Sequence, residues 1–297
     1  MTNDNWFKSA LSLQGSVVRR IMPPVLASMV YAIIVKLIHI TFPDVHQPVL
    51  GTLIPAIVLS LLLVFRTNTA YDRFWEGRKL IGKILITGRN LSRQLLTGIP
   101  DKNSEVSQIQ QKVLRLLPAF FWAAVLRLRK EPIDQRLASL LTAEQVQRLE
   151  GSSHRPLEIA KWISDHFSQL HQQNFIDTVQ LTNYNNLVDQ MVDYMTGCER
   201  ILNTPMPLAY AKHLKHLLIL YCLFLPFQIV QELGWASVVA TGVTTFALFG
   251  IEAIGLEIEN PFGYDYNDLP LESIYQRLRD DIEELQSNHG LPTLQLS

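Results

Sequence analysis

Three apolar residues, Ile57, Leu61 and Phe65, follow one another at intervals of four residues. In a helix this spacing puts them in one line, here called the apolar stripe. The line then becomes polar, and its next members, the polar stripe, are Asn68, Asp72 and Glu76. One interpretation is ordinary helix packing, with the polar part facing water. The other is a pore lining, in which a narrow apolar ring can dewet above a wet vestibule.

The helix that carries both stripes is expected to be continuous. No Gly or Pro lies between Val64 and Phe74, although the chain changes there from apolar to strongly charged. Thr and Asn are moderate helix formers that do not forbid a helix at this point. We therefore predict one helix that leaves an apolar medium and continues into a charged domain.

The composition is that of an unusually apolar chain. Of its 297 residues, 48% are hydrophobic and 18% are charged. Soluble domains usually carry about 25% charged residues. The formal net charge of −1 argues against bulk binding of nucleic acid. The two cysteines offer neither a disulfide framework nor the spacing of a metal site.

Four apolar stretches approach the length of a membrane span, for which roughly 20 mostly apolar residues are needed. They cover residues 21–42, 49–65, 214–231 and 233–254. The third is short on its own and also fits a buried helix. We predict an all-α membrane protein with four transmembrane helices. A further apolar segment, residues 115–128, is interrupted by arginines and is predicted to be a buried helix outside the membrane.

Lysine and arginine mark one side of these spans. Arg19 and Arg20 precede the first span, a basic cluster at 66–83 follows the second, and Lys212 and Lys215 precede the third. The turns between the first two and the last two spans contain neither residue. The positive-inside rule therefore places both termini on the cytoplasmic side. We predict a single domain over 1–297, whose cytosolic helical part comprises residues 66–212 and 258–297.

Three long blocks of sequence come in a characteristic order. They are FRTNTAYDRFWEGRKLIGK at 65–83, RILNTPMPLAYAKHLKHLLILYCLFLPF at 200–227 and GLEIENPFGYDYNDLPLE at 255–272. Together with a weaker match, LQGSVVRRI at 13–21, they resemble the bestrophin family of ion channels in its bacterial and plastid-like branch. The resemblance spans nearly the whole chain.

This resemblance implies a homopentamer of four-span subunits around a central pore, in a bacterial plasma membrane or a thylakoid-type membrane. It places the hydrophobic neck of the family on the apolar stripe, so two lines of reasoning select the same residues. The middle neck residue is aromatic in animal members but is Leu61 here, which leaves ring width and gating open. A second, cytosolic constriction aligns near Thr182.

The resemblance also raises the question of calcium. Animal bestrophins bind calcium with a run of acids after Asn-Pro-Phe-Gly, and only Asp265 and Asp268 remain here at matching positions. Calcium takes six to eight oxygen ligands, so two carboxylates leave much to other groups. We favour the alternative of a capped turn, in which Asn267 or Asp268 caps the helix that follows. No other cofactor is predicted.

The sequence leaves the permeant ion open. The resemblance implies a passive channel for anions, with chloride first and bicarbonate second. The alternative is a cation channel of the same fold. Asp72 and Glu76 in the polar stripe favour cations unless other residues neutralise them. Glu252, Glu257 and Glu259 are expected to pair with arginines of the 66–79 helix. A secondary transporter or a membrane scaffold is less favoured, and no enzyme motif is found.

Overall fold

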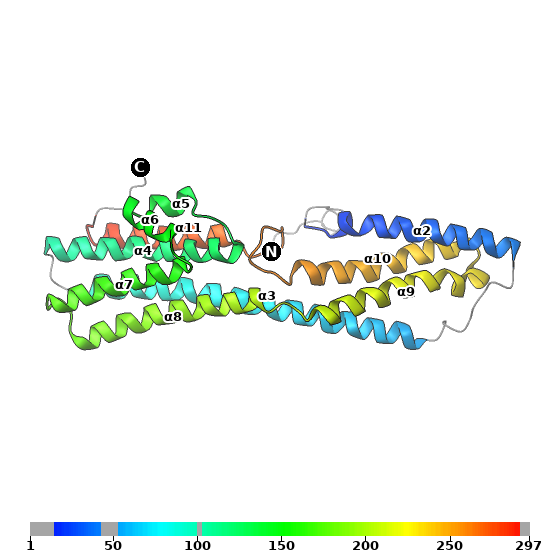
Figure 1. Ribbon diagram of the computed structural model, residues 1–297, viewed down its shortest axis with the longest axis horizontal. Coiled ribbons are helices and arrows are strands. Elements are labelled where there is room, and N and C mark those ends of the chain that lie inside the picture. The colour runs from blue at the N-terminus through cyan, green and yellow to red at the C-terminus, as the bar shows by residue number, and fades with distance from the viewer. Residues whose placement is uncertain (1–14, 43–52, 100–102, 292–297) are drawn as a thin grey trace. The chain divides into compact units, whose positions relative to one another are not determined.

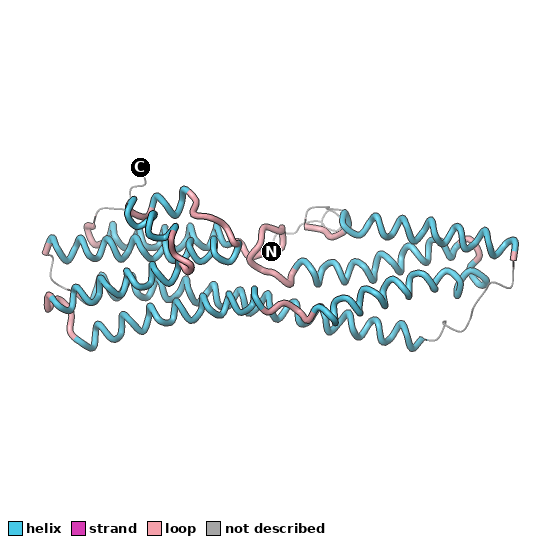
Figure 2. Tube along the Cα trace, in the orientation of Figure 1, coloured by secondary structure: helices cyan, strands magenta, loops and turns pink. Residues whose placement is uncertain are grey.

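The computed structural model describes residues 15–42, 53–99 and 103–291, and all regular structure in these ranges is helical (Figure 2). Ten helices are described, and they are α2 (Val18–Thr41), α3 (Leu53–Gly98), α4 (Ser104–Arg129), α5 (Gln135–Ser139), α6 (Ala143–Glu150), α7 (Arg155–Gln172), α8 (Thr178–Asn203), α9 (Leu208–Leu233), α10 (Ala236–Glu257) and α11 (Leu271–Asn288). The prediction of an all-α chain is confirmed for this part of the protein.

The chain divides into two compact units. The first contains the described residues up to Phe74 together with Thr204–Asp268, and the second contains Trp75–Asn203 and the described residues from Leu269. The prediction of a single domain over 1–297 stays a prediction.

The first unit contains three helices that are long and apolar enough to cross a membrane. These are α2 with 24 residues, α9 with 26 and α10 with 22. They correspond to the predicted spans at 21–42, 214–231 and 233–254. Helix α10 packs against both α2 and α9, as Figure 1 shows. The approach to α2 is close, since a Cβ atom on Gly242 would lie 2.8 Å from the side chain of Met29.

The predicted span at 49–65 begins in residues outside the described part, so the span as a whole stays a prediction. Its remainder forms the start of α3, which continues without a break for 46 residues. The expectation of one helix running from an apolar into a charged segment is therefore confirmed. In the first unit, Leu59 and Leu63 of α3 pack against Leu214 and Leu218 of α9.

The second unit is built around α4, which packs against α7, α8 and α11. Residues 115–128, predicted to form a buried helix, lie in α4, and Phe120 and Phe121 are each only 1% exposed. Asn103 caps the start of α4 by accepting a hydrogen bond from the amide of Glu105, as expected at an N-cap. Cys198, near the C-terminal end of α8, is buried and is a free thiol.

Candidate functional site

The apolar stripe of α3 is exposed in the single chain. Ile57, Leu61 and Phe65 have 60%, 52% and 56% of their surface accessible. The opposite face is buried, because Leu59 and Leu63 pack against α9. Large apolar side chains exposed in a row mark a surface that something else covers. That this stripe forms the neck of a pore stays a prediction.

The polar stripe is also accessible. Asn68 and Asp72 are exposed, and Glu76 is partly exposed. Asp72 forms no ion pair with any described residue. The hydroxyl group of Thr69, next to this line, donates to the carbonyl of Phe65 at 2.9 Å and so supports the helix locally.

Two lysines continue the line and were missed by the sequence reasoning, which stopped at Glu76. Lys79 and Lys83 follow Glu76 at i+3 and i+7, a spacing that keeps them on the same face of the helix. The periodicity that identified the stripe would have found them. Lys79 Nζ lies 2.8 Å from Glu76 Oε2, and both side chains are accessible. Lys83 lies over the ring of Tyr194 at 5.1 Å, a cation–π contact with α8.

These cations favour the ionised form of Glu76. The hydrogen bond from Lys79 is the largest effect and lowers the pKa of the Glu76 carboxyl. Burial opposes it as the second-largest effect, and the charges of Lys79, Lys83 and Arg200 lower the pKa further. Glu76 is therefore a carboxylate at neutral pH. On its own face of α3, Lys79 and Lys83 equal in number the two acids of the polar stripe, Asp72 and Glu76.

Arg66, by contrast, is turned into the interior of the first unit. It is 1% exposed, and its Nη2 lies 3.4 Å from Glu259 Oε2. Glu259 also accepts a hydrogen bond from the amide of Met206 at 3.0 Å. The predicted pairing between an arginine of α3 and a glutamate after the last span is thus confirmed for Arg66 and Glu259.

Arg73 is held by the same segments. Its Nε donates to the carbonyl of Glu259 at 3.2 Å, and its Nη1 donates to the carbonyl of Thr204 at 2.5 Å. The sequence left open whether Arg66 and Arg73 neutralise the acids of the polar stripe. In the structure both side chains engage Glu259, and the partner of Glu76 is Lys79.

The other two glutamates behave differently from Glu259. Glu257 accepts a hydrogen bond from the side-chain amide of Asn267 at 2.8 Å and is not paired with a described arginine. Glu252 is buried in α10, and its Oε1 has no hydrogen-bond partner among the described residues. The prediction that these two acids pair with arginines of α3 is wrong, because only Glu259 comes within reach of Arg66.

Thr182 lies on α8 in the second unit. Its side chain is exposed, and its hydroxyl donates to the carbonyl of Thr178 at 2.8 Å within the same helix. The role of Thr182 as a cytosolic constriction stays a prediction. The neck residues belong to the first unit.

Asp265 and Asp268 lie together in one turn. Asp268 Oδ2 accepts a hydrogen bond from the Asp265 amide at 2.8 Å, and the Asp268 amide donates to the Asp265 carbonyl at 3.0 Å. Helix α11 has Pro270 at its N-cap, with no side-chain cap. The expectation that Asn267 or Asp268 caps this helix is therefore wrong: Asp268 caps its own turn.

The fit of this turn to calcium is poor. One Asp268 oxygen already accepts from the backbone, whereas calcium takes six to eight oxygens. Among the described residues, no group of three or more His, Cys, Asp or Glu side chains is placed to hold a metal ion. Calcium binding by Asp265 and Asp268 stays a prediction.

The fold and the candidate site together define an all-helical membrane protein with an accessible apolar and polar line on its longest helix. Residues 1–284 match the family described as Bacterial/Fungal Bestrophin protein. The chain belongs to this bestrophin family.

Similar proteins agree with this assignment. The chain is 47% identical over 283 residues to a voltage-dependent anion channel-forming protein of Nostoc sp., covering 95% of this chain and 92% of that protein. It is 46% identical to a protein of the same description from Synechocystis sp., covering 96% and 95%. The crystal structure of a bacterial bestrophin homologue from Klebsiella pneumoniae superimposes with a TM-score of 0.84 at 26% identity, covering 90% of this chain and 98% of that one.

Proposed function

We propose that this protein is a passive anion channel, a homopentamer that conducts chloride and, second to it, bicarbonate. The family and the names of the two relatives above support a channel rather than an enzyme. The driving force is the gradient of the ion itself. The channel lies in a bacterial plasma membrane or a thylakoid-type membrane, with both termini on the cytoplasmic side.

The observation that carries the anion preference is the ion pair between Glu76 and Lys79, 2.8 Å long. An apolar neck has no charge of its own, so the sign of the permeant ion comes from charges beside it. Glu76 is matched by Lys79, and Lys83 adds a second positive charge on the same face. The lower part of the line therefore favours anions.

The neck is the second part of the proposal. One chain supplies one apolar stripe, so a closed ring requires several copies, and cyclic symmetry is the simple solution. Five copies of Ile57, Leu61 and Phe65 would surround one axis, which agrees with their exposure in the single chain. The second transmembrane helix in this arrangement comprises residues 49–65, beside α2, α9 and α10. Thr182 would form a further constriction in the cytosolic part.

One observation favours the alternative of a cation channel. Asp72 lies between the neck and Glu76, is exposed, and forms no ion pair with a described residue. A ring of such carboxylates attracts cations. The balance between Asp72 on one side and Lys79 with Lys83 on the other decides the selectivity.

The experiment is a reversal potential measured across a planar bilayer with purified protein in a KCl gradient. The anion channel predicts a reversal near the Nernst potential of chloride. A reversal near that of potassium would replace it with the cation channel. The absence of any current would contradict the channel function and favour a transporter or a scaffold.

A further inference from the structure

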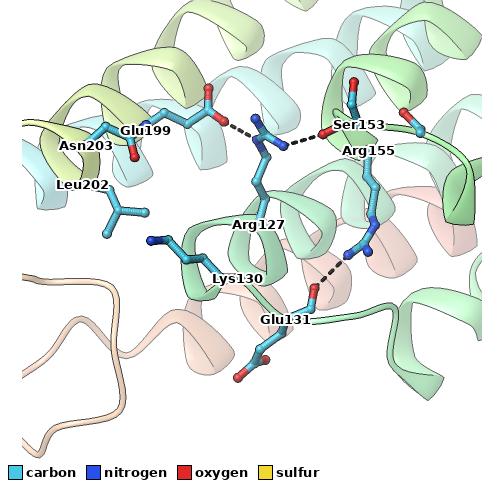
Figure 3. Close-up of a pocket in the computed structure, with 9 residues that line it drawn as sticks. Arg127, Lys130, Glu131, Ser153, Arg155, Glu199, Leu202 and Asn203 are labelled. Carbon is cyan, nitrogen blue, oxygen red and sulfur yellow. Dashed lines mark hydrogen bonds and ion pairs between the residues drawn. The ribbon is translucent and has the colours of Figure 1, made fainter.

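The second unit contains a basic cavity apart from the candidate ion pathway. Its volume is about 360 Å³, within the range of pockets that hold small molecules. It lies where the end of α4, the start of α7 and the end of α8 meet (Figure 3). Three of its lining residues are cations, and they are Arg127, Lys130 and Arg155.

Hydrogen bonds hold the two arginines in place, and some of their N–H donors remain unused. Arg127 Nε donates to the Glu199 carboxylate, and Arg127 Nη1 donates to the Ser153 carbonyl at 2.7 Å. Arg155 Nη1 donates to the Glu131 carbonyl at 2.7 Å. A guanidinium group has five N–H donors. Among the described residues, Nη2 of Arg127 and both Nε and Nη2 of Arg155 have no acceptor.

Lys130 supplies the third cation from a fixed backbone. It ends α4 in the left-handed conformation, with φ of 59°, and its amide donates to the Arg127 carbonyl. Its side chain is exposed, and its ammonium group forms no ion pair with any described residue. A left-handed position is usually occupied by Gly or Asn, although a lysine at a helix C-terminus also interacts favourably with the helix dipole.

Two acids, Glu131 and Glu199, line the cavity beside the three cations. The Glu199 carboxylate is shared between Arg127 and His154, whose Nε2 lies 3.4 Å away. Figure 3 shows the Glu131 carboxylate turned away from the guanidinium groups of Arg127 and Arg155. The cavity lining therefore carries three cations and two carboxylates, and it is rich in donors.

We propose that this cavity binds a phosphate group. A phosphate carries up to two negative charges and several acceptor oxygens, which match two guanidinium edges and one ammonium group. A singly charged chloride ion would use few of these directional donors. The proposal is independent of the channel function, because it concerns binding by residues outside the stripes of α3.

Two kinds of molecule carry such a phosphate group. One is a free phosphate ester. The other is the headgroup of an anionic lipid, because Asn203 lines the cavity and only residues 204–207 separate it from α9, a helix long and apolar enough to span a membrane.

The test uses the full-length protein. Inorganic phosphate is titrated calorimetrically into protein in detergent, in a chloride-free buffer, and retention of phosphatidic acid from nanodiscs is counted by native mass spectrometry. The variants are Lys130→Asn, which suits the left-handed backbone, and Arg155→Gln. Lys130→Arg keeps the charge, and Lys161→Gln removes one elsewhere, from an exposed position on α7. Circular dichroism and melting temperature establish that each variant is folded.

The expected result is binding of at least one probe, weakened about tenfold by Lys130→Asn and by Arg155→Gln but kept by Lys130→Arg and Lys161→Gln. Binding of inorganic phosphate identifies a free ester, and binding of phosphatidic acid alone identifies a lipid. If neither probe binds, if both variants bind as the parent does, or if Lys161→Gln weakens binding equally, the proposal is overturned.

Discussion

Arg66 and Glu259 form an ion pair across 3.4 Å, although they are separated by most of the length of the chain. Arg66 is 1% exposed, and the other Glu259 oxygen accepts from the Met206 amide. The pair thus ties α3 to the segment before α9 and to the segment after α10. Because Arg66 directly follows Phe65, the same pair fixes the rotation of α3 at the predicted neck.

Breaking this pair should destabilise the protein. Arg66→Gln or Glu259→Gln leaves one buried charge without its partner, which costs about 3 kcal/mol in comparable pairs. The melting temperature of each variant in detergent measures the effect. Glu257→Gln is the matched control, because Glu257 is bonded to Asn267 and not to a described arginine.

The double variant, Arg66→Gln with Glu259→Gln, tests whether the two residues stabilise the protein through their direct interaction. With both charges removed, the loss should be smaller than the sum of the two single losses, because no unpaired buried charge remains. Strictly additive losses would show that Arg66 and Glu259 act independently.

Much of the fold was predictable from local pattern. The absence of Gly and Pro between Val64 and Phe74 predicted the continuous α3, and apolar length predicted α2, α9 and α10. Such features depend on neighbours along the chain, whose periodicity and hydrophobicity a sequence displays directly.

The sequence did not predict which residues far apart in the chain pair with one another. Glu252, Glu257 and Glu259 look equivalent in sequence, yet only Glu259 meets Arg66, because the packing of several helices determines which carboxylate comes within reach. Asp268 likewise caps its own turn and not α11. The direction of an aspartate side chain at a turn depends on backbone geometry that composition does not specify.

The apolar stripe offers a direct test of the neck. Replacing Ile57, Leu61 and Phe65 together by Ala should raise the single-channel conductance several-fold, because the ring widens and wets. Single-channel recording in planar bilayers measures it. A triple variant that conducts like the parent would show that these side chains only pack.

The control for the neck lies on the opposite face of α3. Leu59→Ala with Leu63→Ala removes side chains that are 3% and 2% exposed and pack on α9. This variant should lower the melting temperature, because it leaves cavities in the core, without raising the conductance. An equal rise in conductance from both faces would mean that general loosening of the helix opens the channel.

The turn of Asp265 and Asp268 should be structural. Asp268→Ala removes the acceptor for the Asp265 amide and should lower stability by about 1 kcal/mol, whereas Asp268→Asn should retain most of it. Thermal unfolding in detergent measures both. Currents of the parent should be the same in calcium and in a calcium chelator. A calcium-dependent current that Asp265→Ala with Asp268→Ala abolishes would establish a calcium site here.

The charges below the neck should set the selectivity. Replacing Lys79 and Lys83 by Gln removes the two cations that face Glu76, so the reversal potential in a KCl gradient should shift toward that of potassium. Asp72→Asn should shift it the opposite way. Lys161→Gln, which removes an exposed charge from α7, should leave it unchanged.

The pH dependence of the same reversal potential tests whether Glu76 faces the permeant ion. Lys79 lowers the pKa of the Glu76 carboxyl, so this group stays charged from neutral to mildly acidic pH and the selectivity should be constant there. As the pH falls below the usual range of a glutamate, Glu76 becomes protonated, its negative charge is lost, and the preference for anions should rise. Glu76→Gln should show the raised preference already at neutral pH and lose this acid transition. If the variant keeps the transition, another group is responsible, and Glu76 does not face the permeant ion.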